Sequence, residues 1–147
     1  LFFHLNKMYR PILQWAWFIS VVALCASTLY HLIEMVMMPS LMQWTMTIPT
    51  ESAHSTVLAW DEILSHLGGT FIPTSLAIGG LIYTAVMFRT KEIPTLWSYW
   101  FFFIWVMVLL VSFFVSYLGV FMLFFLSIAI LLYVPWIWQI GKIVKNS

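Results

Sequence analysis

Four long apolar segments follow one another along the chain, and shorter, more polar stretches separate most of them. We place the spans at residues 12–38, 67–88, 95–116 and 120–140. The hydrocarbon core of a bilayer is about 30 Å thick, and a helix of about 20 apolar residues crosses it. The pattern therefore predicts an all-α polytopic integral membrane protein, in which residues 1–147 form one domain, a bundle of four transmembrane helices.

The segment between the first two spans, residues 39–66, is the longest polar interruption. Within residues 39–56, Met42, Trp44 and Met46 alternate with polar residues. Amphipathic aromatic rings favour the membrane–water interface. We therefore expect an outer connector that lies along the membrane surface.

The second helix is predicted to be longer than the membrane requires. Ser55 or Thr56 supplies a cap at its start, because a hydroxyl oxygen accepts hydrogen bonds from the free N–H groups there. A helix over residues 57–88 is about 48 Å long at 1.5 Å per residue. Its first ten or so residues must then lie in the interface. Pro73 leaves the Gly69 carbonyl without its backbone donor, which predicts a kink.

Composition supports the membrane assignment and narrows the partners. Hydrophobic residues make up 63% of the chain and charged residues 7%, whereas a soluble domain carries about a quarter charged residues. The net charge of +1 gives no field that attracts nucleic acid. The single cysteine, Cys25, cannot form an internal disulfide. The expected partners are membrane lipids together with other membrane subunits or a second copy of the chain.

Charge also predicts the orientation of the bundle. All six basic residues fall at one end of it: Lys7 and Arg10 before the first span, Arg89 and Lys91 between the second and third, and Lys142 and Lys145 after the fourth. Basic residues near membrane spans favour the cytoplasmic side. Both termini are therefore expected to be cytoplasmic, in a multi-pass protein of a plasma or inner membrane. Four of the five acids lie at the outer end: Glu34, Glu51, Asp61 and Glu62.

The candidate site is a group of ionisable residues at this outer end. Helical rise places Glu34 and His66 at the same depth if the first two long helices are antiparallel neighbours. His31 precedes Glu34 by three residues and Glu62 precedes His66 by four, so each pair shares a helix face. One interpretation is a polar pair that joins two helices. The other is a metal site built from facing helices.

Methionines make copper the first metal to consider. Five of the nine methionines fall between residues 35 and 46, and Met35 and Met38 complete the proposed metal ligands. Thioethers select Cu(I), and imidazole also suits copper. The alternative is that these side chains fill irregular apolar surface. His31 and His66 lie at similar depths, so a single haem is the other cofactor considered.

The remaining pattern favours a protein without catalytic activity. The third and fourth spans are aromatic and aliphatic all round, and the connecting loops there are short. The chain has no glycine-rich phosphate loop, no His-Glu-x-x-His motif and no Cys-x-x-Cys motif. We therefore expect a small membrane subunit or accessory protein that packs within a larger complex. The alternatives are a metal or redox-cofactor protein that uses the outer cluster, and a small transporter.

Overall fold

Long helices form almost all of the chain. The computed structural model describes the backbone of residues 2–47, 51–90, 93–118 and 120–146, and the side chains of 9–47, 51–90, 93–114, 127–129, 131–139 and 141–142. Within these ranges, residues 90, 93 and 94 are the only ones outside helices. The elements are α1 (Phe2–Leu32), η1 (Ile33–Met37), α2 (Met38–Thr47), α3 (Glu51–His66), η2 (Leu67–Phe71), α4 (Ile72–Arg89), α5 (Thr95–Leu118) and α6 (Val120–Asn146).

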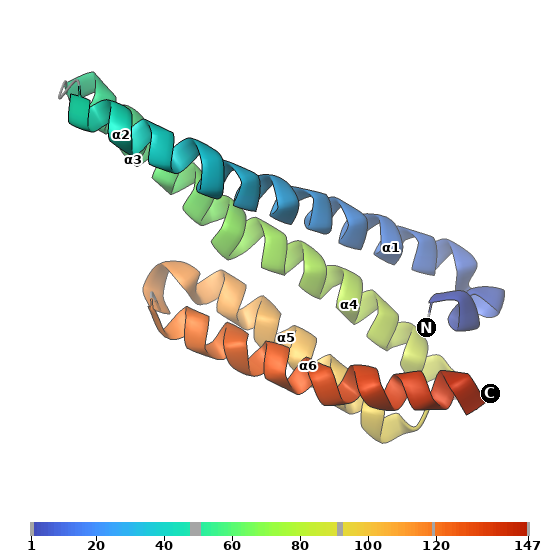
Figure 1. Ribbon diagram of the computed structural model, residues 1–147. Helices are drawn as coiled ribbons and strands as arrows, with labels where there is room; N and C mark the ends of the chain where they lie inside the picture. Colours follow the sequence, from blue (N-terminus) through green and yellow to red (C-terminus); the bar gives the residue numbers. More distant parts are fainter. Residues whose placement is uncertain (1, 48–50, 91–92, 119, 147) are drawn as a thin grey trace.

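These elements make two helical hairpins, one much longer than the other (Figure 1). In the long hairpin, α1 after its kink at Tyr9, η1 and α2 run as one continuous rod, and α3, η2 and α4 return beside it. The short hairpin consists of α5 and α6. Among the described residues, three helical stretches are long and apolar enough to cross a membrane: Tyr9–Thr47, Glu51–Arg89 and Thr95–Phe114. The all-α prediction and the presence of several candidate spans are confirmed.

The predicted outer connector differs most from the structure. Helix α2 continues the first span through Pro39 to Thr47, and α3 begins at Glu51 rather than at Ser55 or Thr56. The hydroxyls of Ser55 and Thr56, the two predicted caps, donate instead to the Ser52 carbonyl within the same helix, at 2.9 and 2.8 Å. The polar residues of the segment therefore lie on helix surfaces.

Each rod of the long hairpin contains a π-turn just before a proline. The Met38 N–H bonds the Ile33 carbonyl ahead of Pro39, and the Ile72 N–H bonds the Leu67 carbonyl ahead of Pro73. Proline has no N–H, and its ring clashes with the carbonyl four residues earlier. A turn widened by one residue accommodates that carbonyl without ending the helix. The distortion predicted at Pro73 takes this form.

Helix α4 is the centre of the bundle. It packs against α1 on one side and α5 on the other, and α6 packs against α5. Adjacent glycines make both approaches close. A Cβ on Gly79 would lie 2.6 Å from the Ser20 hydroxyl oxygen of α1, and a Cβ on Gly80 would overlap the Trp105 indole of α5. Small residues permit this close packing of helices in lipid.

An aromatic core joins the helices at the end near the two termini. Phe101 of α5 stacks on Trp136 of α6 with ring centroids 3.8 Å apart, and the Trp100 indole N–H donates to the Leu132 carbonyl at 3.1 Å. Leu13 of α1 and Met87 of α4 are fully buried in the same cluster. This core therefore ties the short hairpin to the long one.

We predict that Gly80→Ala destabilises the bundle by about 1–3 kcal/mol, the usual cost of overpacking. The added methyl group must displace the Trp105 ring from α4. The matched control is Gly141→Ala in α6, because a Cβ there meets nothing within 4 Å. Unfolding of both variants in detergent, followed by circular dichroism, measures the difference. Equal stability of the two variants would contradict the close α4–α5 packing.

Candidate functional site

The candidate polar site lies at the level of the two π-turns. The helix Tyr9–Thr47 has 39 residues, which makes it about 58 Å long at 1.5 Å per residue. About 20 residues cross a hydrocarbon core, so a span that begins near Ile12 ends close to η1. The same count backward from Phe88 ends in η2. The π-turns therefore mark the level at which the apolar, membrane-spanning half of each rod ends.

Tyr30 and Gly68 hold the two rods together at this level. A Cβ on Gly68 would lie 2.8 Å from the Tyr30 ring, so the ring lies directly against the backbone of η2. The Tyr30 hydroxyl lies close enough to Glu34 and Asp61 to interact with both carboxylates. The tyrosine thus connects acids from both rods.

His31 joins the same group from the exposed side. Its Nδ1 lies 3.6 Å from Glu34 Oε2, and its ring meets the Tyr30 ring edge-on at a centroid distance of 5.0 Å. Both side chains of the His31–Glu34 pair are more than half exposed. An exposed pair of this kind contributes at most about 1 kcal/mol. The group is therefore held mainly by Tyr30.

The structure gives the predicted metal ligands different surroundings. His31 and Glu34 lie together, whereas Glu62 and His66 are exposed on α3. Two further ligands also differ: the Met35 side chain, within η1, is 76% exposed, whereas Met38, at the start of α2, is buried. Among the described residues, no group of three or more His, Cys, Asp or Glu side chains could hold a metal ion. The proposals of copper and haem remain predictions without support from this geometry.

Sequence analysis missed Tyr30 as a member of the group. The available signals were its position four residues before Glu34, on the same helix face, and the Gly68-Gly69 pair on the facing rod. The predicted depths were compared only for charged residues and histidines. This comparison located the correct level of the bundle but not the side chain that bridges the rods.

Beyond the π-turns, α2 and α3 pack mainly against each other and against the adjoining turns. Their inward positions recur at the three- and four-residue spacing of a coiled coil: Met38, Leu41 and Thr45 on α2, and Ala53, Val57, Trp60 and Leu64 on α3. The hairpin extends past the turn that joins α5 and α6 (Figure 1). Its outer surfaces leave large apolar side chains exposed: Met42, Trp44, Met46, Leu58 and Ile63.

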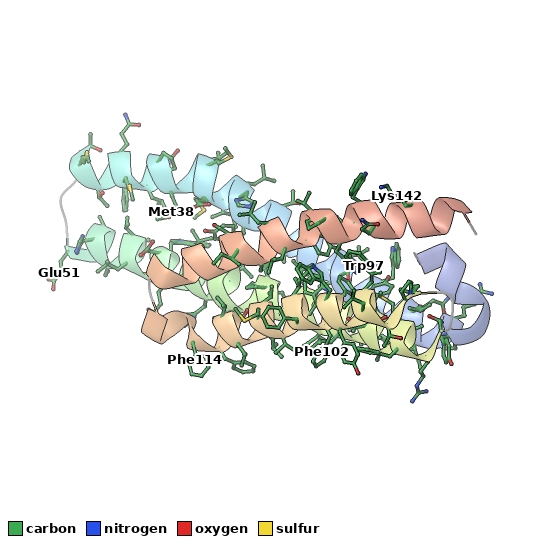
Figure 2. The ribbon with its side chains drawn as sticks, turned by 90° about the horizontal axis from the view of Figure 1, so that it is seen from below. Met38, Glu51, Trp97, Phe102, Phe114 and Lys142 are labelled. Carbon is green, nitrogen blue, oxygen red and sulfur yellow. The ribbon has the colours of Figure 1, made fainter. Side chains whose placement is uncertain are left out.

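The hairpin is also the acidic end of the molecule. No Lys or Arg occurs between residues 11 and 88, and Glu34, Glu51, Asp61 and Glu62 all fall there. Glu51 and Lys142 lie at opposite ends of the structure (Figure 2). Along the sequence, the four acids are therefore far from every Lys and Arg of this chain. This combination of acidic and apolar surface is the most distinctive feature outside the apolar spans.

A second group of polar atoms lies inside the protein, between α4, α5 and α6. The Ser98 hydroxyl and the indole nitrogens of Trp105 and Trp136 are buried without hydrogen-bond partners in the described structure. An unpaired buried polar group costs about 1–3 kcal/mol. The surrounding described side chains are mainly aromatic and aliphatic, and they include no His, Cys, Asp or Glu. We therefore do not consider this region a reaction centre.

We predict that Tyr30→Phe lowers the free energy of unfolding by about 0.5–1.5 kcal/mol, because it removes the polar contact between the hydroxyl and Glu34. Tyr99→Phe is the matched control: Tyr99 is 62% exposed and contacts Phe88 only through ring packing. Tyr30→Phe should have no effect in a Glu34→Ala background. A full effect in that background, measured by the same unfolding assay, would show that Glu34 is not the partner.

The chain was compared with known proteins at three levels, and none supplies a function. No protein-family model matches it, and neither curated proteins nor solved structures include a significant match. Its function must therefore be inferred from the two features described above. One is the group of Tyr30, His31, Glu34 and Asp61 at the π-turns. The other is the α2–α3 hairpin beyond them, with its acidic and apolar surface.

Proposed function

We propose that the chain is a small integral membrane subunit that packs within a larger complex and engages a partner through the α2–α3 hairpin. In this proposal α6 is the fourth span, and both termini are on the cytoplasmic side of a plasma or inner membrane. The distribution of basic residues supports that orientation. An apolar stretch within α6, Ser127–Gln139, supports the fourth span.

The observation that carries the proposal is the exposed apolar surface of a hairpin too long for the bilayer. Each rod of 39 residues exceeds the hydrocarbon by nearly half its length. Met46 is 83% exposed, and Leu58 and Ile63 are each 55% exposed. Clustered apolar side chains in water mark sites of interaction. A partner that covers this surface would remove the unfavourable exposure of these apolar side chains to water.

The membrane-level surfaces are consistent with the same role. Helix α1 packs along α4 and leaves Trp15, Phe18 and Leu24 more than half exposed. Helix α5 likewise exposes Phe103 and Phe113. Lipid chains satisfy such surfaces, and so do the apolar helices of neighbouring subunits. The hairpin therefore provides the specific support for a partner, while the spans provide the membrane anchor.

The other functional classes have less support. A transporter requires polar or charged groups near the midplane, and the sequence has no Asp, Glu, Lys or Arg in residues 63–88 or 93–141. A copper or redox centre requires converging ligands, and Met35 and Met38 have different surroundings. Neither class accounts for the length of the hairpin. The subunit proposal does.

We predict that shortening the hairpin abolishes the complex but leaves insertion intact. Deleting residues 40–46 from α2 and 52–58 from α3 removes one heptad from each helix, or about 10 Å of length. The wild-type chain, of 17.2 kDa, should migrate in a larger complex on native gels after extraction in mild detergent. The shortened chain should migrate alone.

A length-preserving variant controls for general damage to the hairpin. Alanine at Ser40, Gln43 and Thr47 changes only exposed polar positions of α2 and should leave the complex unchanged. A wild-type chain that migrates alone would contradict the proposal. So would a shortened chain that keeps its partners.

A further inference from the structure

One side of the hairpin is distinguished by its composition. On α2, Met42 follows the buried Met38 by four residues and precedes the half-buried Thr45 by three. On α3, Asp61 follows the half-buried Val57 by four and precedes the buried Leu64 by three. In an antiparallel pair of helices, two positions with the same spacing from the inward-facing residues lie on the same side of the pair. The reason is that a twofold axis perpendicular to the plane of the two helices interchanges such positions. Met42 and Asp61 therefore share a side.

Neighbouring residues extend this side into a continuous surface. Met46 lies one turn beyond Met42 on α2, and His54 lies one heptad before Asp61 on α3, with Leu58 between them. All five side chains are exposed. We call Met42, Met46, His54, Leu58 and Asp61 the hairpin face. Trp44 and Ile63 each follow an inward-facing residue by three positions and lie on the opposite flank.

Charge limits what covers the hairpin face. Lys142 lies at the end of the molecule opposite to Glu51 (Figure 2). A second copy would bring an α2–α3 hairpin with the same three acids, Glu51, Asp61 and Glu62, and no Lys or Arg to pair with them. Anionic lipid headgroups would repel those acids as well. A basic protein surface is the complementary occupant that remains.

We propose that the hairpin face docks an extramembrane protein domain through a surface rich in Lys and Arg with apolar side chains at its centre. The methionines supply adaptable apolar contacts, since their flexible thioether chains fit irregular surfaces. Asp61 lies on the face, and Glu51 and Glu62 lie on the outward side of α3 beside it. They steer the basic partner and fix its orientation. This inference rests on the proposed subunit function and names the partner's chemistry.

Site-specific photocrosslinking in cells of the source organism tests the docking. A photoreactive residue replaces Met46 on the hairpin face in one full-length chain and Trp44 on the opposite flank in another. We expect irradiation to couple the Met46 position, and not the Trp44 position, to one protein whose extramembrane domain is basic. Equal coupling at both positions would overturn the inference, as would capture of lipid alone, of a second copy alone, or of a protein without a basic surface.

Two single-charge variants test the same face with a matched control. Met42→Lys and Trp44→Lys each add one positive charge to the same helix, two residues apart. Met42→Lys should lower the crosslinking yield from Met46 about tenfold, because it places a cation against a basic partner. Trp44→Lys should leave the yield within twofold. Equal losses in both variants would overturn the docking face.

A third variant tests the charge of Asp61 with little risk of misfolding. Asp61→Asn changes no side-chain size and should weaken crosslinking severalfold, with a smaller dependence on salt than in the wild-type chain. An unchanged yield would overturn the role of Asp61.

A complex that persists on native gels without face-specific crosslinks rejects the docking face alone. A chain that migrates alone rejects the subunit function itself.

Discussion

The mismatch between helix length and bilayer thickness is the constraint on which the rest of the structure depends. A rod of about 58 Å cannot be contained in a hydrocarbon core of about 30 Å. Nearly half of each rod in the long hairpin must therefore be solvated or covered by protein. Apart from Arg10 and Arg89 at the far ends of the rods, the polar residues follow this division: the charged and histidine side chains begin at His31 on one rod and end at His66 on the other.

The two halves of the long hairpin are held by different interactions. Inside the apolar half, Gly79 and Gly80 let α4 approach α1 and α5 closely, and an aromatic core fixes α6 to α5. Outside it, α2 and α3 interlock through apolar side chains at coiled-coil spacing. Tyr30 packs on the Gly68 backbone where these halves meet. The widened turns ahead of Pro39 and Pro73 let both rods pass this level without ending.

The sequence predicted the helical architecture, because runs of apolar residues report membrane spans directly. It also placed His31 and Glu34 on one face, since spacing along a single helix is a local property. It did not predict helix α2, because Pro39 and the alternating polar and apolar residues 40–47 resemble a connector unless their packing against α3 is known. Tyr30 was missed for the same reason. Its role depends on Gly68 of the other rod, and no local pattern reports that contact.

Cysteine accessibility along the first rod tests the central claim most directly. In a Cys25→Ser background, single cysteines replace Leu24, Leu29, Gln43 and Trp44, all of which have exposed side chains and lie outside the hairpin face. A membrane-impermeant maleimide applied to intact cells should label positions 43 and 44 and spare positions 24 and 29, because hydrocarbon protects the latter. Protection of positions 43 and 44, or labelling of positions 24 and 29, would contradict a hairpin that leaves the membrane at the π-turns.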